Sequence, residues 1–353
     1  TDDINLGISG VEKYFNKILN DKKKINYPLN LTLDSNLQFL IREELIKAKN
    51  DFNNIGSGAI LMDVDNGEIL SLVSLPDYDL NKRFSINDNI YTNKITLGVY
   101  ELGSVFKTFT VAAGLENKVV KPETIFENLE HSIRCDKYTI TEHDKLPQNL
   151  NTEEILVRSS NIGAVRIAQK IGTEKYKNFL NELGILESIN FDLEEVGTPI
   201  PFRWGKCRLA TTSYGHGITT TPLQLARAYA ILSNGGYKIE PHIFKNEQKI
   251  FKKKKQIISY KTSNEINLML RKVVSMDEGT ANFANVEGYD VGGKTGTALK
   301  YNSKENTYEG FRNMLTYLGE YNFNLDNKIV YGTDLEFFKA RYPTDPGNNK
   351  THD

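Results

Sequence analysis

Residues 58–75 constrain the fold most strongly, because two apolar runs flank the turn sequence Asp65-Asn66-Gly67. An Asn-Gly pair between two such runs is typical of a tight β-hairpin. The segments 290–298 and 315–321 have the pattern of further strands, and 328–331 is a candidate for a third. The sequence therefore predicts an antiparallel sheet built from both ends of the chain.

Apolar residues recur at helical spacing between and before these strand segments. The pattern predicts helices over 7–20, 34–50, 104–116, 151–170, 173–183, 222–233 and 264–275, with a short strand at 30–33. Strands near both ends with many helices between them indicate an α+β fold, in which an antiparallel sheet is flanked by helices and carries an all-helical lobe.

The composition is that of a globular protein, with 39% hydrophobic and 25% charged residues among 353. A formal net charge of -1 gives no reason to expect nucleic acid as a partner. No apolar run approaches the roughly 20 residues that span a bilayer. Because the chain begins without Met, we interpret it as a piece of a longer protein, so a membrane anchor outside it stays open.

The two cysteines, Cys135 and Cys207, have no metal-ligand spacing to each other or to histidine. One disulfide is conceivable in an oxidising compartment, but we expect two separate, mostly buried thiols. His216 stands between Gly215 and Gly217, so we expect it in a turn or a site wall rather than as a catalytic base.

The expected helix from Ser104 to Glu116 is apolar on nearly every side, which predicts burial. Positions i and i+3 of a first helical turn share a face, so the amine of Lys107 should lie beside the hydroxyl of Ser104 and activate it. Burial and a second cation, Lys294, should lower the pKa of Lys107. The alternative, a helix cap followed by a surface lysine, does not explain a lysine on an apolar helix.

Ser159 and Asn161 form a second candidate motif. The serine suits proton transfer to a leaving amine, and the asparagine amide suits holding a substrate carbonyl and orienting Lys107. The alternative interpretation is an ordinary helix cap, since serine and asparagine both favour that position.

A third candidate motif comprises Lys294, Thr295, Gly296 and Thr297 on an expected edge strand. Its side chains suit a substrate carboxylate, its strand suits an extended peptide, and the Thr297 N–H suits an oxyanion hole. Gly296 should let the substrate approach the backbone closely. Residues 288–295 also satisfy the phosphate-loop pattern G-x-x-x-x-G-K-[ST], but no helix is expected after them, as that loop requires.

The three motifs in this order match the S-x-x-K, S-x-N and K-T-G set of β-lactamases and penicillin-binding proteins. YELGSVFKTFT, VRSSNIGAV, VGGKTGTA and SYGHGITTTPLQLA resemble the transpeptidase domain of class B penicillin-binding proteins, most closely the septal, division-specific FtsI type. The resemblance implies a penicillin-binding-protein/serine β-lactamase-like transpeptidase fold over 30–353. It assigns 1–29 to the end of a non-catalytic pedestal module, and the part from about 322 departs from the family pattern.

The resemblance also implies an activity, a serine-type D,D-transpeptidase that cross-links peptidoglycan during septal cell-wall synthesis. Ser104 would be the acylated nucleophile and Lys107 its base, with Ser159, Asn161 and Lys294 completing the catalytic set; Thr295, Gly296 and Thr297 would bind substrate. The donor would be a stem peptide ending in D-Ala-D-Ala, the acceptor an amine of a second stem peptide, and β-lactams would inhibit. No metal or cofactor is implied. The family works in the periplasm on a single N-terminal anchor in the inner membrane, with a lipid II polymerase and division proteins as partners.

Two alternatives stay open. A serine β-lactamase or D,D-carboxypeptidase would use water in place of the acceptor amine. A class A β-lactamase needs a glutamate on a loop after the second motif, whereas Glu174 and Glu182 fall in an expected helix. A penicillin-binding sensor or scaffold that acylates without turnover would carry the same motifs.

Overall fold

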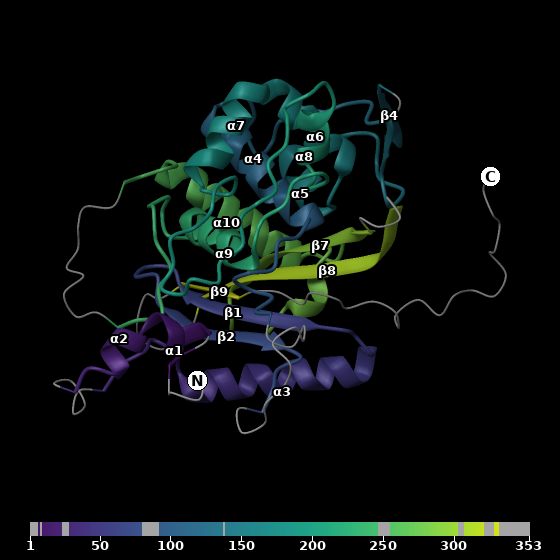
Figure 1. Ribbon diagram of the computed structural model, residues 1–353. Helices are drawn as coiled ribbons and strands as arrows, with labels where there is room; N and C mark the ends of the chain where they lie inside the picture. Colours follow the sequence, from purple (N-terminus) through teal and green to yellow (C-terminus); the bar gives the residue numbers. More distant parts are fainter. Residues whose placement is uncertain are drawn as a thin grey trace.

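A computed structural model of the chain describes residues 6–7, 9–22, 28–79, 92–136, 138–245, 255–302, 307–320 and 328–331, with side chains as far as residue 298. Five strands form one sheet in the order β2-β1-β9-β8-β7. Helix α3 (Ser35–Phe52) lies along β1 and β2, while the other long helices gather on the opposite side of the sheet (Figure 1). The expected α+β arrangement is confirmed.

The sheet is assembled from both ends of the chain, as expected. β1 (Ser57–Asp63) and β2 (Ile69–Leu75) form the antiparallel hairpin. β7 (Val291–Asn302) pairs with β8 (Thr307–Glu320), and β9 (Lys328–Tyr331) joins β8 to β1. The strand expected at 328–331 is therefore β9, the central strand of the sheet, and β7 is an edge strand. Of the atypical part from about 322, the structure describes only residues 328–331, and the rest lies outside the described residues.

The remaining elements are α1 (Gly10–Tyr14), α2 (Asn16–Leu19), the 3-10 turn η2 (Gly103–Val105), α4 (Phe106–Glu116), β3 (Ile125–Phe126), β4 (Ser132–Cys135), β5 (Tyr138–Thr141), β6 (Leu150–Asn151), α5 (Thr152–Val157), α6 (Asn161–Ile171), α7 (Thr173–Glu182), α8 (Arg208–Thr212), α9 (Pro222–Ser233), α10 (Tyr260–Ser275) and the 3-10 turn η3 (Asn282–Ala284). Among these elements, α4, α7, α9 and α10 lie where helices were expected, whereas the short strands β3 to β6 were not predicted.

Three predictions of local structure were wrong. The helix expected over 151–170 is broken between α5 and α6, and the second motif occupies the break. The helix expected over 7–20 is divided into α1 and α2. No strand forms at 30–33, where Leu31 makes only an isolated bridge to Phe244.

Helix α4 is the centre of the main hydrophobic core. Every residue from Phe106 to Leu115 is buried, as the apolar pattern predicts. The Tyr229 hydroxyl of α9 donates a hydrogen bond to the Val105 carbonyl at 2.9 Å, and the ring of Phe109 packs against the Tyr229 ring at 5.1 Å. These contacts fix the start of α4, and with it the first motif.

Cys135 and Cys207 are joined by a disulfide, so the expectation of two separate thiols was wrong. Cys135 ends β4 in the β4–β5 hairpin, and Cys207 precedes α8. Sequence spacing could not reveal the pairing, because the tertiary fold brings the two Cα atoms to 5.8 Å across 72 residues. None of the helices in the described ranges combines the length and apolar character that crossing a membrane requires.

Candidate active site

The hydroxyl of Ser159, in the second motif, forms hydrogen bonds with residues of the first and the third motifs. Lys107 of α4 donates hydrogen bonds to the Ser159 carbonyl and, at 3.0 Å, to its hydroxyl oxygen. Lys294 of β7 donates to the same hydroxyl oxygen at 2.9 Å. Residues far apart in the sequence therefore place two amines on one acceptor, in an interior that excludes water from both amines.

The two amines are perturbed in the same direction. Burial lowers the pKa of Lys107 to about 7, against the opposing charges of Glu142 and Asp144. Burial, followed by the charge of Lys107, lowers the pKa of Lys294 well below its usual range. The repulsion between the two cations is mutual, so each lysine disfavours the charged form of the other. Because the amines share one hydroxyl, we expect them to titrate as a coupled pair.

Ser104 lies in the 3-10 turn η2, half-buried, immediately before α4. Within the described part of the chain, no hydrogen bond joins its hydroxyl to Lys107, so the expected direct contact is not formed. The Lys107 amine turns to Ser159 instead, because a carbonyl and a hydroxyl together satisfy a buried donor. Catalytic hydrogen bonds commonly tighten only when substrate is bound, and this geometry keeps Ser104 a candidate nucleophile.

The turn that carries Ser104 is held between two backbones. A Cβ on Gly103, whose φ is +62°, would collide with the Thr297 carbonyl of β7, and a Cβ on Gly215 would collide with the Gly103 carbonyl. A Cβ on Gly296 would lie 2.5 Å from the Leu102 carbonyl. Gly296 is therefore required for the close contact between β7 and this turn.

The second motif begins with a residue in a rarely populated conformation. Ser159 has φ +59°, and Ser160 caps α6 by accepting a hydrogen bond from the Gly163 N–H at 2.9 Å. The Asn161 Nδ2 donates to the Thr141 carbonyl at 2.7 Å. The buried Asn161 Oδ1 has no partner among the described residues. Asn161 therefore does not orient Lys107, contrary to expectation, and its oxygen stays open as an acceptor.

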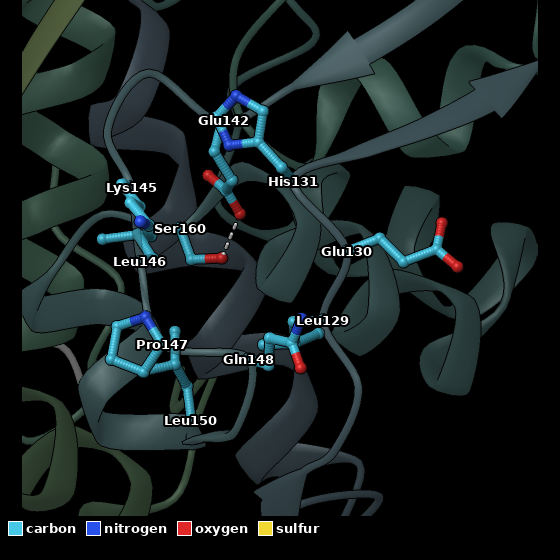
Figure 2. Close-up of a pocket in the computed structure, with 10 residues that line it drawn as sticks. All are labelled: Leu129, Glu130, His131, Glu142, Lys145, Leu146, Pro147, Gln148, Leu150 and Ser160. Atoms are coloured by element: carbon cyan, nitrogen blue, oxygen red, sulfur yellow. Dashed lines mark hydrogen bonds between the residues drawn. The ribbon is translucent and has the colours of Figure 1, made fainter.

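Glu142 is the residue that sequence reasoning missed. Its carboxylate accepts hydrogen bonds from the Ser160 hydroxyl at 2.6 Å and from the N–H groups of Asn161 and Ile162 at 2.7 and 2.9 Å. Figure 2 shows the bond between Glu142 and Ser160 in the wall of a cavity of about 450 Å³. No local pattern could reveal this role, because Glu142 follows β5 and meets the motif only through the fold.

The third motif lies within an uninterrupted strand. Lys294 also donates to the Thr295 carbonyl at 3.0 Å, and the Thr295 hydroxyl bonds Thr280 at 2.9 Å. Thr297 is exposed. Because β7 continues to Asn302, no helix follows the motif and the phosphate-loop interpretation fails.

His216 lies in a wall beside the turn of Ser104, as expected. Its Nδ1 is 3.3 Å from a carboxylate oxygen of Glu101, and its ring stacks on Tyr214. The flanking Gly215 and Gly217 have φ values of +85° and +71°, which side chains rarely adopt, so the tight turn explains the glycines.

Two buried lysines on one serine hydroxyl, between an apolar helix and an edge strand, define a class of serine acyl-transfer domain. The chain belongs to the penicillin binding protein transpeptidase domain family, whose family model matches residues 57–330. Its similarity to curated proteins and to solved structures agrees with this membership.

Two curated relatives are each 34% identical to the chain. They are a probable peptidoglycan D,D-transpeptidase FtsI from Caulobacter vibrioides, aligned over 292 residues, and stage V sporulation protein D from Bacillus subtilis, aligned over 313 residues. Each alignment covers 82% of this chain, and 49% and 47% of the relatives respectively, so the chain spans about half their length. The transpeptidase domain of penicillin-binding protein 3 from Burkholderia pseudomallei superposes with a TM-score of 0.74 at 28% identity, over 87% of this chain and 88% of the other.

Proposed function

We propose that this chain is the catalytic domain of a serine-type peptidoglycan D,D-transpeptidase that β-lactams inhibit. The observation that carries the proposal is the pair of buried amines, Lys107 and Lys294, on the Ser159 hydroxyl beside the turn of Ser104. A lysine with a pKa of about 7 is partly unprotonated at neutral pH, which general-base work requires. The family name and the transpeptidase name of the Caulobacter relative support the same activity.

Acylation follows from the roles of these groups. The Ser104 oxygen attacks the carbonyl between the two terminal D-alanines of a stem peptide, and its proton passes to unprotonated Lys107. Backbone N–H groups at Ser104 and Thr297 stabilise the oxyanion. The carbon–nitrogen bond then breaks, and the departing D-alanine amine takes a proton through the Ser159 hydroxyl, which both lysines contact.

Transfer completes the cycle. The amine of a second stem peptide attacks the acyl carbon and loses a proton to Lys107. The bond from the acyl carbon to the Ser104 oxygen then breaks, that oxygen takes the proton back from Lys107, and the new amide bond is the cross-link. Among the described strands none pairs with the outer edge of β7, which suits binding the donor peptide as an added strand. Lys294, Thr295 and Thr297 suit its terminal carboxylate, and the open Asn161 oxygen suits a substrate N–H.

The finer assignments rest on resemblance. We propose a role in septal synthesis, a membrane anchor preceding the chain, a periplasmic location and partnership with a lipid II polymerase and division proteins. Residues 1–29 would end a preceding pedestal module, with the transpeptidase domain over 30–353. The Bacillus relative, named for sporulation, makes a sporulation-specific wall synthase the competing role.

A β-lactamase is disfavoured by where the candidate water-activating carboxylates lie. Glu174 and Glu182 are within α7, and the Glu182 carboxylate is paired with Lys255 at the surface. A class A enzyme would need such a glutamate on a loop beside the acyl group.

Intact-mass measurement after incubation with benzylpenicillin tests the proposal. We expect one stable adduct on the wild type and none on Ser104→Ala. A stem pentapeptide with an added amine should then yield D-alanine and a cross-linked product from the wild type alone. Hydrolysed drug without an adduct would indicate a β-lactamase, and an adduct without peptide turnover would indicate a sensor.

A further inference from the structure

The second motif needs support from outside itself. Ser159 has φ +59°, a conformation that is unfavourable for a residue with a side chain. Its N–H donates to the Leu156 carbonyl at 3.2 Å, which ties it to the end of α5. The carbonyl and hydroxyl of Ser159 then face the two lysines. They keep this orientation only if the residues that follow Ser159 are also held in place.

A single carboxylate holds those following residues. Glu142 accepts from the Ser160 hydroxyl, the Asn161 N–H and the Ile162 N–H, so both carboxylate oxygens are occupied. These N–H groups are the first of α6, which have no partner inside the helix. A carboxylate at this end also meets the positive end of the helix dipole. Glu142 is only 8% exposed, which strengthens each of these bonds.

Glu142 is itself fixed by a tied hairpin. Its N–H donates to the His131 carbonyl at 2.9 Å, and the neighbouring Thr141 carbonyl accepts from the Asn161 side chain. The disulfide from Cys135 joins the same hairpin to the start of α8. The carboxylate therefore approaches the second motif from a support that belongs neither to α5 nor to α6.

We propose that Glu142 is a positioning residue for acylation, whose carboxylate holds the turn at Ser159 so that its carbonyl and hydroxyl face Lys107 and Lys294. This role rests on the proposed function. Because both of its oxygens are occupied, Glu142 acts through the turn and not on the substrate. The negative charge of Glu142 has a second effect, because it acts on the pKa of Lys107.

The charged groups that act on Lys107 make that second effect measurable. Glu142 and Asp144 raise the pKa of Lys107 against burial, and Lys294 is the coupled cation. Removing the Glu142 charge should lower the pKa of Lys107 further. The acid limb of the acylation rate should then move to lower pH, an effect that a merely structural contact would not have.

The test compares the variants Glu142→Gln and Glu142→Asp with a matched control. Glu154→Gln makes the same chemical change at another helix start, where Glu154 accepts from the Asn151 N–H at 2.8 Å without touching the second motif. The rate constant for acylation by a fluorescent penicillin is measured from pH 5 to 10, together with thermal unfolding of each variant.

Glu142→Gln cannot accept from all three donors, since its amide nitrogen is itself a donor. We expect its acylation at pH 8 to fall at least about tenfold, as loss of a hydrogen bond to a charged group implies, with the acid limb displaced to lower pH. Glu142→Asp should lose less rate and keep the wild-type midpoint, and Glu154→Gln should change neither.

Wild-type rate and midpoint in Glu142→Gln would overturn the proposal. Equal losses in both Glu142 variants without a displaced midpoint would also overturn it, because they would reduce Glu142 to a stabilising contact. Should Glu142→Gln not fold, Ser160→Ala removes one of the three donors, and an unchanged acylation rate there would count against the proposal equally. A wild type that penicillin does not acylate would instead reject the proposed function, before any variant is compared.

Discussion

Lys294 donates a hydrogen bond of 2.9 Å to the hydroxyl oxygen of Ser159, a residue 135 positions earlier in the chain. The same oxygen accepts from Lys107, so one hydroxyl lies between two buried amines. A serine hydroxyl can accept hydrogen bonds from both amines and donate its own proton, so it can pass a proton between them.

Ser159→Ala removes this shared hydroxyl. Lys107 keeps the residue-159 carbonyl and Lys294 keeps the Thr295 carbonyl, so we expect the fold to survive. The rate constant for acylation by benzylpenicillin should fall roughly ten- to a hundredfold, in line with a lost bond to a charged donor. Stopped-flow acylation measures this fall. A rate within twofold of wild type would contradict the shared role of the hydroxyl.

The acylation rate should depend on pH through Lys107. Burial lowers the pKa of this amine to about 7. Below that value the amine is protonated and cannot act as a base, so the rate should rise through pH 7 and level off above about pH 8. A profile from pH 5 to 10 checks this expectation. A rate that rises only above pH 9 would mean that Lys107 titrates like an ordinary lysine.

The same shift makes stability depend on pH. In the unfolded chain Lys107 holds its proton up to the ordinary lysine pKa of 10.5, whereas the folded group releases it near a pKa of about 7. Between these values the unfolded state binds more protons, so the free energy of unfolding contributed by Lys107 rises with pH. Relative to Lys107→Met, the wild type should gain roughly 2 kcal/mol from pH 7 to 9. Urea unfolding of both proteins measures the difference, and a difference that shrinks or stays constant would contradict the prediction.

Gly103→Ala should lower stability for two reasons, an unfavourable backbone conformation and a steric clash with β7. Its φ of +62° is unfavourable for alanine, and the added Cβ would also meet the Thr297 carbonyl. Gly10→Ala is the matched control, since its φ of +58° is close to that of Gly103 but nothing lies within 4 Å of its Cβ. We expect a loss of about 1 kcal/mol in unfolding free energy at Gly10. The loss at Gly103 should be larger, and acylation should be abolished there alone. Equal losses at both positions would rule out the close contact between this turn and β7.

Reduction of the disulfide should destabilise the domain. The link between Cys135 and Cys207 closes a loop across 72 residues. The chain-entropy relation assigns such a loop about 4 kcal/mol of stability. Thermal unfolding with and without dithiothreitol should show a lower midpoint in the reductant. The double variant Cys135→Ala with Cys207→Ala should unfold at that lower midpoint in both conditions, and a wild type insensitive to reductant would contradict the link.

Sequence patterns predicted the parts of the fold that depend on local chemistry. The Asp65-Asn66-Gly67 turn indicated the β1–β2 hairpin, and continuous apolar character indicated the buried α4. The polar start of the expected helix over 34–50 is also local, since the Asp34 carboxylate accepts from the Asn36 and Leu37 N–H groups. Each of these features is decided within a few residues of sequence.

The parts that were missed depend on contacts between distant segments. The break before Asn161 is stabilised by Glu142 from another element, so periodicity alone predicted one continuous helix. The cysteines carry no local sign of pairing. The first, second and third motifs were recognised as candidates, but which amine would point at which hydroxyl depends on how α4, α6 and β7 meet.

The disulfide between Cys135 and Cys207 closes a covalent loop that contains one part of the site and not the others. This loop encloses Glu142 and the second motif, whereas Ser104, Lys107 and Lys294 lie outside it, on the buried helix, its leading turn and the sheet. The covalent link therefore restrains the segment that both lysines contact, whereas packing and strand pairing restrain the other two motifs. This link forms only where cysteines can be oxidised.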